Sequence, residues 1–304
     1  MDSQQPPALS NVAPGPTQKR ALPLRHPSEV PMYGVMVILN LIIVLVLLRI
    51  GLAPWTWPGW LGGGAAEDVA AAAAGTLLWV VPGVVIVRQI QRAAVAGTTV
   101  ALSEAQFPDL RAAAAEFAHR LGLAKPPQVY LANGNGALNA FAAQSGVKNN
   151  AVTLSNELFA NLEQNNREGL RFIIGHELAH IRLGHVSLRY QLSMCFSGLL
   201  PILGPTLSRL REYSCDRNGA ALEPAGERGL VLLAAGRYAH ATVQVGELVQ
   251  QGRELGGFWV EIAQLQRSHP FPVRRLWRLY QLGLFGQGAP PAGLVAPAAQ
   301  AQRR

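Results

Sequence analysis

The 304-residue chain contains little cysteine, lysine or aspartate. Its two cysteines, Cys195 and Cys215, fit a reducing compartment, and the fold does not depend on a disulfide framework. Only 3 of its 26 basic residues are lysines, and the arginines are scattered or flank apolar runs. No basic patch interleaved with aromatic residues occurs, so the net charge of +8 does not predict a nucleic-acid partner. Attraction to anionic lipid headgroups explains the excess charge as well.

Two long runs of the sequence carry no charge. Residues 31–48 are rich in isoleucine, leucine and valine, and Arg49 can snorkel, which extends this run to about residue 53. Residues 69–87 are also uncharged, although their first third is mostly alanine. We therefore predict transmembrane spans at 31–53 and 69–87. The alternatives are a signal peptide for the first run and a buried alanine-rich helix for the second, and a long polar segment before the first run argues against the signal peptide.

The basic residues around these runs predict an orientation. Lys19, Arg20 and Arg25 precede the first span, and Arg88 and Arg92 follow the second. The loop between the spans holds no lysine or arginine inside it. By the positive-inside rule both ends and the main domain lie in the cytoplasm, in a multi-pass protein of the plasma or inner membrane whose partner is the lipid bilayer.

The remaining sequence predicts a mostly helical α+β domain with a small edge sheet. A tail of residues 1–29, rich in proline, glutamine and serine, is expected to be disordered. The transmembrane hairpin covers 30–90, the main domain 91–285, and a low-complexity tail 286–304. Hydrophobic periodicity and turn residues predict the following elements: a helix at 107–124, strands at 127–133 and 149–155, and helices from about 156, at 167–184, around 212, within 228–251 and at 272–283.

The segment "GHELAHIRLGH", residues 175–185, holds three of the seven histidines. His176 and His180 are four residues apart, so they share one face of a helix, whereas His185 is swung away from that face. Glu177 lies one step round from His176, close enough to reach a water on the same ion. This is the HExxH arrangement of zinc hydrolases. The alternative is a helix whose polar face happens to carry histidine and glutamate.

A catalytic zinc usually takes three protein ligands, so a third must come from elsewhere. Leu183 and Val186 stand where a metzincin needs glycine and histidine. Downstream, "SRLREYSCDRNGAAL" (208–222) places Glu212 and Asp216 on one helical face. We expect Glu212 on the metal and Asp216 hydrogen-bonded to a liganding imidazole. A solvated helix with internal ion pairs is the alternative, and Cys215 is a weaker rival ligand.

Four segments now resemble a known family. "NAFA" (139–142), the HExxH helix, the 208–222 helix and "SHPFPVRRL" (268–276) occur in the order seen in HtpX-like and CAAX-prenyl-protease-like membrane zinc metallopeptidases. The resemblance covers roughly residues 107–280. It implies a zincin-type metallopeptidase domain that binds one Zn²⁺ ion.

The resemblance also implies roles for particular residues. His176, His180 and Glu212 would bind zinc, Glu177 would be the general base, and Asp216 would support a liganding histidine. His269 and Arg275 would lie near the active site, and Asn139, Ala140 and Phe141 would begin the edge strand along which an extended substrate lies. The implied activity is that of a zinc endopeptidase (EC 3.4.24 type).

The predicted function is therefore hydrolysis of peptide bonds in unfolded or membrane-associated proteins, in protein quality control. One alternative is a membrane-anchored zinc-binding chaperone or interaction protein without hydrolytic activity. Another is a latent enzyme in which His269 fills the open metal position. Partners would be protein or peptide substrates and the bilayer, and a homo-oligomer is compatible with the sequence.

Overall fold

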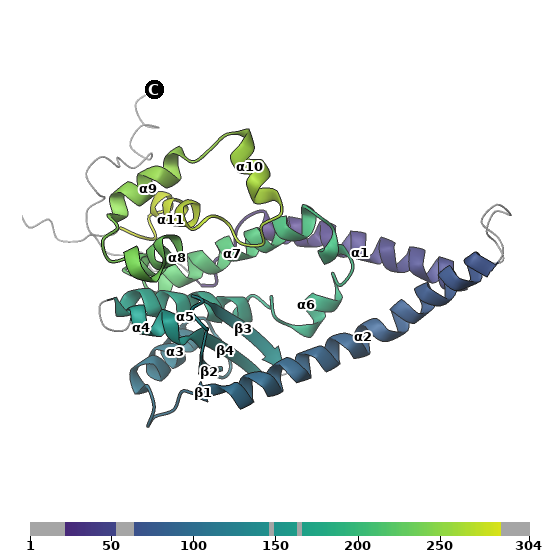
Figure 1. Ribbon diagram of the computed structural model, residues 1–304, viewed down its shortest axis with the longest axis horizontal. Coiled ribbons are helices and arrows are strands. Elements are labelled where there is room, and N and C mark those ends of the chain that lie inside the picture. The colour runs from purple at the N-terminus through teal and green to yellow at the C-terminus, as the bar shows by residue number, and fades with distance from the viewer. Residues whose placement is uncertain (1–21, 53–63, 146–148, 163–165, 287–304) are drawn as a thin grey trace, which may run out of the picture.

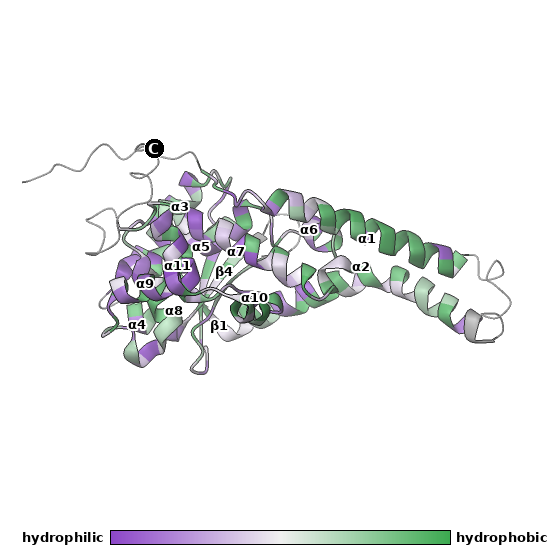
Figure 2. Cartoon of the chain, turned by 90° about the horizontal axis from the view of Figure 1, so that it is seen from above, coloured by the Kyte–Doolittle hydropathy of each residue, from purple (hydrophilic) through white to green (hydrophobic). Residues whose placement is uncertain are grey.

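The computed structural model describes residues 22–52, 64–145, 149–162 and 166–286, so most of both predicted tails lies outside the described residues. Two apolar helices come first and pack together as a hairpin, α1 (Glu29–Leu52) and α2 (Gly64–Thr98). The hairpin projects from a globular body (Figure 1), and α1 is hydrophobic along most of its length (Figure 2). Both helices are long and apolar enough to cross a membrane, and only 11% of each apolar window is buried. So much exposed apolar surface suggests membrane association.

A four-stranded sheet forms one layer of the body. Its strands are β1 (Thr99–Ala101), β2 (Gln128–Ala132), β3 (Ala140–Ser145) and β4 (Asn149–Ser155), in the order β1-β2-β4-β3. β2 runs parallel to β4, and β3 runs antiparallel to it, with Phe141 opposite Thr153. β3 is therefore an edge strand, and no other described strand pairs with its outer side.

Helices make up the rest of the body. They are α3 (Pro108–Arg120), α4 (Asn156–Leu162), α5 (Arg167–Arg182), α6 (Leu188–Leu192), the 3₁₀ helix η3 (Ser197–Leu199), α7 (Leu203–Leu222), α8 (Glu227–Ala239), α9 (Val245–Glu254), α10 (Phe258–Leu265) and α11 (Pro272–Gln281). The predicted fold class is confirmed: the domain is mostly helical, has a small sheet and follows two apolar helices.

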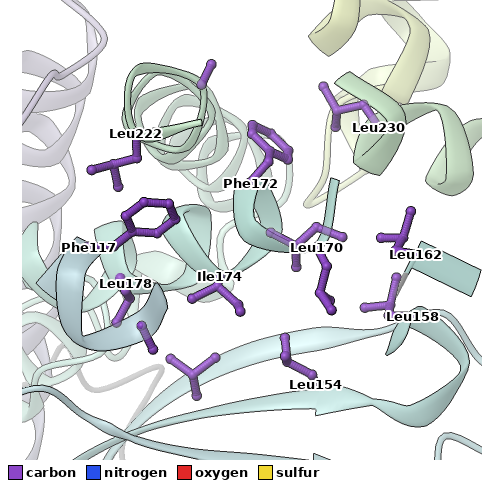
Figure 3. Packing of buried hydrophobic residues seen from close by; sticks show 14 of the residues in the cluster. Phe117, Leu154, Leu158, Leu162, Leu170, Phe172, Ile174, Leu178, Leu222 and Leu230 are labelled. Atoms are coloured by element: carbon purple, nitrogen blue, oxygen red, sulfur yellow. The ribbon is translucent and has the colours of Figure 1, made fainter. Parts of the chain in front are cut away.

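The hydrophobic core surrounds α5 (Figure 3). Leu170, Ile174 and Leu178 repeat at helical spacing and are fully buried. They meet Leu154 of β4 on the sheet side, and Phe172 packs towards α7 and α8 on the other. Because both sides of α5 are covered in its middle, His176, Glu177 and His180 are buried in the centre of the domain.

Glycines allow α5 to approach its neighbours closely. A Cβ at Gly169 would lie 2.8 Å from the backbone nitrogen of Gly229 in α8. A Cβ at Gly219 in α7 would lie 3.0 Å from the carbonyl oxygen of Phe172. No larger side chain fits at these crossings without a shift of the backbone, so the glycines set the short distance between the helices. The α5–α7 crossing positions the site described below.

Residues 22–28 differ from the prediction of a disordered tail, because they pack against α7. The backbone of Leu24 exchanges two hydrogen bonds with the Asn218 side chain, at 2.8 and 2.6 Å. The amide of His26 donates to Ser214 Oγ at 2.8 Å. The composition of the tail did not reveal this, since the partners lie about 190 residues away in the sequence.

Residues 190–202, which carry no charge and connect towards α7, lie beside α1. Buried Asn40 accepts hydrogen bonds from the amides of Phe196 at 2.9 Å and Ser197 at 3.3 Å. Its own amide donates to the carbonyl of Leu192 at 3.5 Å. One polar side chain of an apolar helix thus satisfies the irregular backbone that follows α6.

Candidate metal centre

Three side chains from two helices converge at the α5–α7 crossing. His176 and His180 project from one face of α5, with their Nε2 atoms 3.3 Å apart. Glu212 of α7 places Oε2 3.4 Å from His176 Nε2 and Oε1 3.4 Å from His180 Nε2. All three residues are buried. The structure therefore brings together the three predicted ligands.

The spacing and chemistry of these atoms fit a tetrahedral divalent ion. Ligands about 2.0–2.1 Å from a tetrahedral zinc lie about 3.3–3.4 Å from one another. The three measured distances have these values. If the Nδ1 atoms of both histidines carry their protons, as their neighbours favour, three lone-pair groups face one another at this point. Such a set is repulsive unless a cation lies between them.

The hydrogen-bonding neighbours of Glu212 support an ionised carboxylate. Burial would raise the pKa of Glu212, but His176, His180 and His269 around it hold the pKa well below its ordinary value. His269 precedes α11, and its Nδ1 lies 3.2 Å from Glu212 Oε2. Unlike the other residues of the centre, His269 has a side chain that is 66% exposed, so it is open to solvent.

Cys215 is a second candidate for the third ligand. His176, His180 and Cys215 form a buried group whose ligand atoms lie within 4.8 Å of one another. The Cys215 sulfur is 3.7 Å from Nδ1 of His185, which itself contacts Nδ1 of His180, whereas Glu212 faces the Nε2 atoms. Burial raises the pKa of the Cys215 thiol well above its ordinary value, which favours the non-liganding thiol. Glu212 therefore fits better than Cys215.

Asp216 and Arg275 support the first histidine. Asp216 Oδ1 lies 3.0 Å from His176 Nδ1, although the N–H does not point straight at it. Arg275 of α11 donates from Nε to Asp216 Oδ2 at 2.8 Å and from Nη2 to Oδ1 at 2.6 Å. Burial would raise the pKa of Asp216, but Arg275 and His176 lower it. The same Nη2 is 3.8 Å from Glu212 Oε2, so one guanidinium faces both carboxylates.

Glu177 has a different environment. It follows His176 on α5 and is 7% exposed. In the part of the chain that the structure describes, no hydrogen bond or ion pair holds its carboxylate. Leaving a carboxylate buried without such a partner costs stability, which distinguishes Glu177 from Glu212 and Asp216.

The predicted edge-strand residues lie on β3 or directly before it. Asn139 precedes the strand, and its carbonyl accepts from the amide of Ser155 at 2.8 Å. Ala140 and Phe141 open β3, and Phe141 is exposed. α5 packs against β3, so the open edge of the sheet belongs to the same side of the domain as the helix that carries the histidines.

The sequence places His185 off the face shared by His176 and His180, and the prediction from sequence did not single out Glu29. The ring of His185 is buried, with Nδ1 3.1 Å from His180 Nδ1 and Nε2 3.0 Å from Glu29 Oε1. Two signals were available in the sequence: a third histidine five residues after HExxH, and a lone acid at the start of an apolar run.

A comparison with known protein families matches the part of the chain that carries the HExxH motif. The model of peptidase family M48 matches residues 104–204, a segment that contains α3, three of the four strands (β2, β3 and β4) and α5 with its HExxH motif. No solved structure matches the chain. The match confirms the predicted resemblance and supports a metallopeptidase. It ends in the first turn of α7, so it does not include Glu212, Asp216, His269 or Arg275.

Proposed function

We propose that this chain, whose central third resembles the M48 peptidases, is a membrane-anchored zinc endopeptidase. The observation that supports this most directly is the 3.3–3.4 Å triangle formed by His176 Nε2, His180 Nε2 and the Glu212 carboxylate. These three residues would hold one zinc ion. When bound, zinc would lower the pKa of a coordinated water towards about 7 and polarise a substrate carbonyl.

The residues of the chain would then divide the proton transfers and the positioning among them. Glu177 is unpaired and next to His176, so it would accept the proton of the attacking water and deliver it to the leaving amine. His269 is exposed and contacts Glu212, so it would donate a hydrogen bond to the developing oxyanion. Arg275 is buried and two of its donor nitrogens, Nε and Nη2, bind Asp216, so we assign it to positioning His176 and not to contact with substrate.

Extended, unfolded segments are the substrates that the fold suits. β3 offers a free edge near α5, and a peptide could add to it as a further strand. Main-chain pairing of this kind requires an extended segment, which folded proteins rarely expose. We therefore propose unfolded or membrane-associated proteins as substrates, and protein quality control as the role.

The hairpin of α1 and α2 would anchor the enzyme as a multi-pass protein, with the peptidase domain in the cytoplasm. Arginines support this orientation, because Arg25 precedes α1 and Arg88 lies in α2 where that helix meets the domain. Arg88 donates from both terminal nitrogens to the carbonyl of Val186, at 3.1 and 3.2 Å. A reporter fused after Arg92 should read out on the cytoplasmic side, and a reading on the outer side would overturn the orientation.

The activity is tested by Glu177→Gln in purified, zinc-loaded protein with casein as an unfolded substrate. Loss of a general base should lower kcat by about 10² to 10⁴, with zinc content unchanged. Glu168→Gln is the matched control, because Glu168 is an exposed residue of the same helix. If Glu177→Gln cleaves casein as fast as the wild type, the cleavage does not come from this centre and the proposed peptidase mechanism fails. If zinc-loaded wild type does not cleave casein at all, the alternative of a non-hydrolytic zinc-binding chaperone replaces the peptidase.

A further inference from the structure

A line of three side chains connects the first apolar helix to the metal centre. Glu29, the first residue of α1, accepts from Nε2 of His185, with its Oε1 at 3.0 Å. His185 Nδ1 then lies 3.1 Å from Nδ1 of His180. His180 turns its other nitrogen, Nε2, to His176 and Glu212. All of these side chains are buried, and Glu29 is 1% exposed.

A glycine makes this arrangement possible. α5 ends at Arg182, and Gly184 has a φ of 81°, a left-handed conformation that closes the helix. The chain turns back there, and the amide of His185 donates to the carbonyl of His180 at 3.0 Å. His185 is therefore off the face shared by the two HExxH histidines in sequence, yet its ring packs against that of His180, with ring centroids 5.2 Å apart.

The contacts assign one proton to each bond. If Nε2 of His180 is left as a lone pair for a metal, its Nδ1 carries the proton and donates it to Nδ1 of His185. His185 must then carry its own proton on Nε2, which donates to the Glu29 carboxylate. Both imidazoles are neutral in this scheme, and each donor meets one acceptor. No other orientation of the protons satisfies all the contacts and also frees Nε2 of His180.

Glu29 is itself held in place from two further directions. The hydroxyl of Ser214 on α7 donates to its Oε2, and Arg25 forms an ion pair with its Oε1. Arg25 also donates to the carbonyl of Leu183 at 3.0 Å, close to the end of α5. A buried carboxylate with a hydrogen bond from each side is a fixed acceptor, which can in turn fix the ring of His185.

We propose that Glu29 is a positioning residue for the metal ligand His180, acting through His185. The inference rests on the proposed metal centre. The two liganding histidines then have different supporting carboxylates. Asp216 contacts His176 directly, whereas Glu29 of α1 contacts His185, which in turn contacts His180. The packing of α1 against the domain would thus determine the orientation of the metal ligand His180.

The test measures metal binding in the full chain, in detergent, by chelator competition for zinc and by the visible spectrum of the cobalt-substituted protein. Glu29→Ala should weaken zinc binding about 10- to 100-fold and shift the cobalt bands, because outer partners of metal ligands have effects of this size. Glu29→Gln keeps an oxygen acceptor for His185 and should lose less zinc affinity than Glu29→Ala. His185→Leu should lose as much zinc affinity as Glu29→Ala. His185→Gln retains an acceptor and a donor, so it should keep much of the wild-type affinity.

Asn40→Ala is the matched control, because Asn40 is also a buried polar residue that fastens α1 to the domain but contacts no residue of the line. It should lower the Tm and leave zinc affinity and the cobalt spectrum unchanged. The double variant of Glu29→Ala with His185→Leu should bind zinc no more weakly than either single variant, since both break one line.

Three results would overturn the inference: an unchanged zinc Kd and cobalt spectrum in Glu29→Ala, an equal loss of affinity in Asn40→Ala, or additive losses in the double variant. Absence of stoichiometric zinc from the wild type would instead overturn the proposed function, and the inference with it.

Discussion

The Asp216–Arg275 pair allows a sharp prediction about stability. Asp216 accepts two hydrogen bonds from Arg275 and faces His176 Nδ1, and both members of the pair are buried. In Asp216→Asn one of the two oxygens becomes an NH₂ group. Whichever way the amide is turned, it presents a donor to a donor of Arg275 at about the former distance of 2.6 or 2.8 Å.

The expected loss of stability in Asp216→Asn follows from the unpaired positive charge of Arg275. Removing one partner of a buried ion pair typically costs about 3–5 kcal/mol, because the other charge stays in the interior unpaired. For a domain of this size that corresponds to a fall in Tm of about 6–20 °C. Thermal unfolding followed by near-ultraviolet circular dichroism in detergent, with excess chelator present, measures the change without a contribution from bound metal.

A second substitution separates charge from shape. Adding Arg275→Leu to Asp216→Asn removes the unpaired guanidinium, so the double variant should be more stable than Asp216→Asn alone. If the two single losses add to within about 0.5 kcal/mol, the two groups are not coupled and the reasoning is refuted. In the single variant Arg275 also lacks its partner and remains 3.8 Å from Glu212, so zinc affinity should fall as well.

Three further predictions concern packing, pH and metal. Gly169→Ala should destabilise the domain by about 1–3 kcal/mol in denaturant titrations, because its Cβ would overlap the backbone of Gly229, whereas Gly97→Ala meets nothing within 4 Å and should not destabilise it. The backbone amides of Gly136 and Gly134 donate hydrogen bonds to the Glu157 carboxylate and hold its pKa below the ordinary value of 4.5. A carboxyl with a depressed pKa stabilises the folded state at pH values above its ordinary pKa, and this effect is lost as the pH falls through the folded pKa. The protection factor of the Gly136 amide, which is its exchange rate relative to the unprotected amide at the same pH, should therefore fall below about pH 4.5, and Glu157→Gln should remove this pH dependence. Chelation of zinc should lower the Tm of the wild type and abolish casein cleavage, and an unchanged Tm would contradict a metal bound to the folded state.

The sequence predicted the helix of the HExxH motif well, because its signals are local. Leu170, Ile174 and Leu178 recur at helical spacing, and Asn166 precedes the first turn. The pairing of His176 with His180 follows from the same period. The contact of the two histidines with Glu212 involves a second helix, so the period of α5 alone could not predict it. Glu212 was predicted as the third ligand because it shares one helical face with Asp216 downstream of the motif. The role of each residue in catalysis stays a prediction.

Long-range features could not be predicted. Nothing near residue 24 indicates that Asn218 will bind it, and a segment rich in proline and serine reads as disordered from its composition. α2 continues to Thr98, whereas the predicted span ended at residue 87, because the signal used was absence of charge and not helical tendency. His185 was placed off the metal face correctly, but only the turn at Gly184 shows that it comes back against His180.

The docking of residues 22–28 onto α7 has a consequence for biosynthesis. Leu24 and its partner Asn218 are separated by 194 positions. At translation rates of about 5–20 residues per second, the N-terminal segment leaves the ribosome about 10–40 s before its partner is made. During that time α1 and α2 can enter the bilayer, but the line from Glu29 has no Ser214 to hold it. A nascent chain therefore lacks Glu212 until α7 is made. If the chain is the anchored peptidase proposed above, a ribosome that stalls before α7 would release a fragment that is anchored but cannot cleave neighbouring proteins.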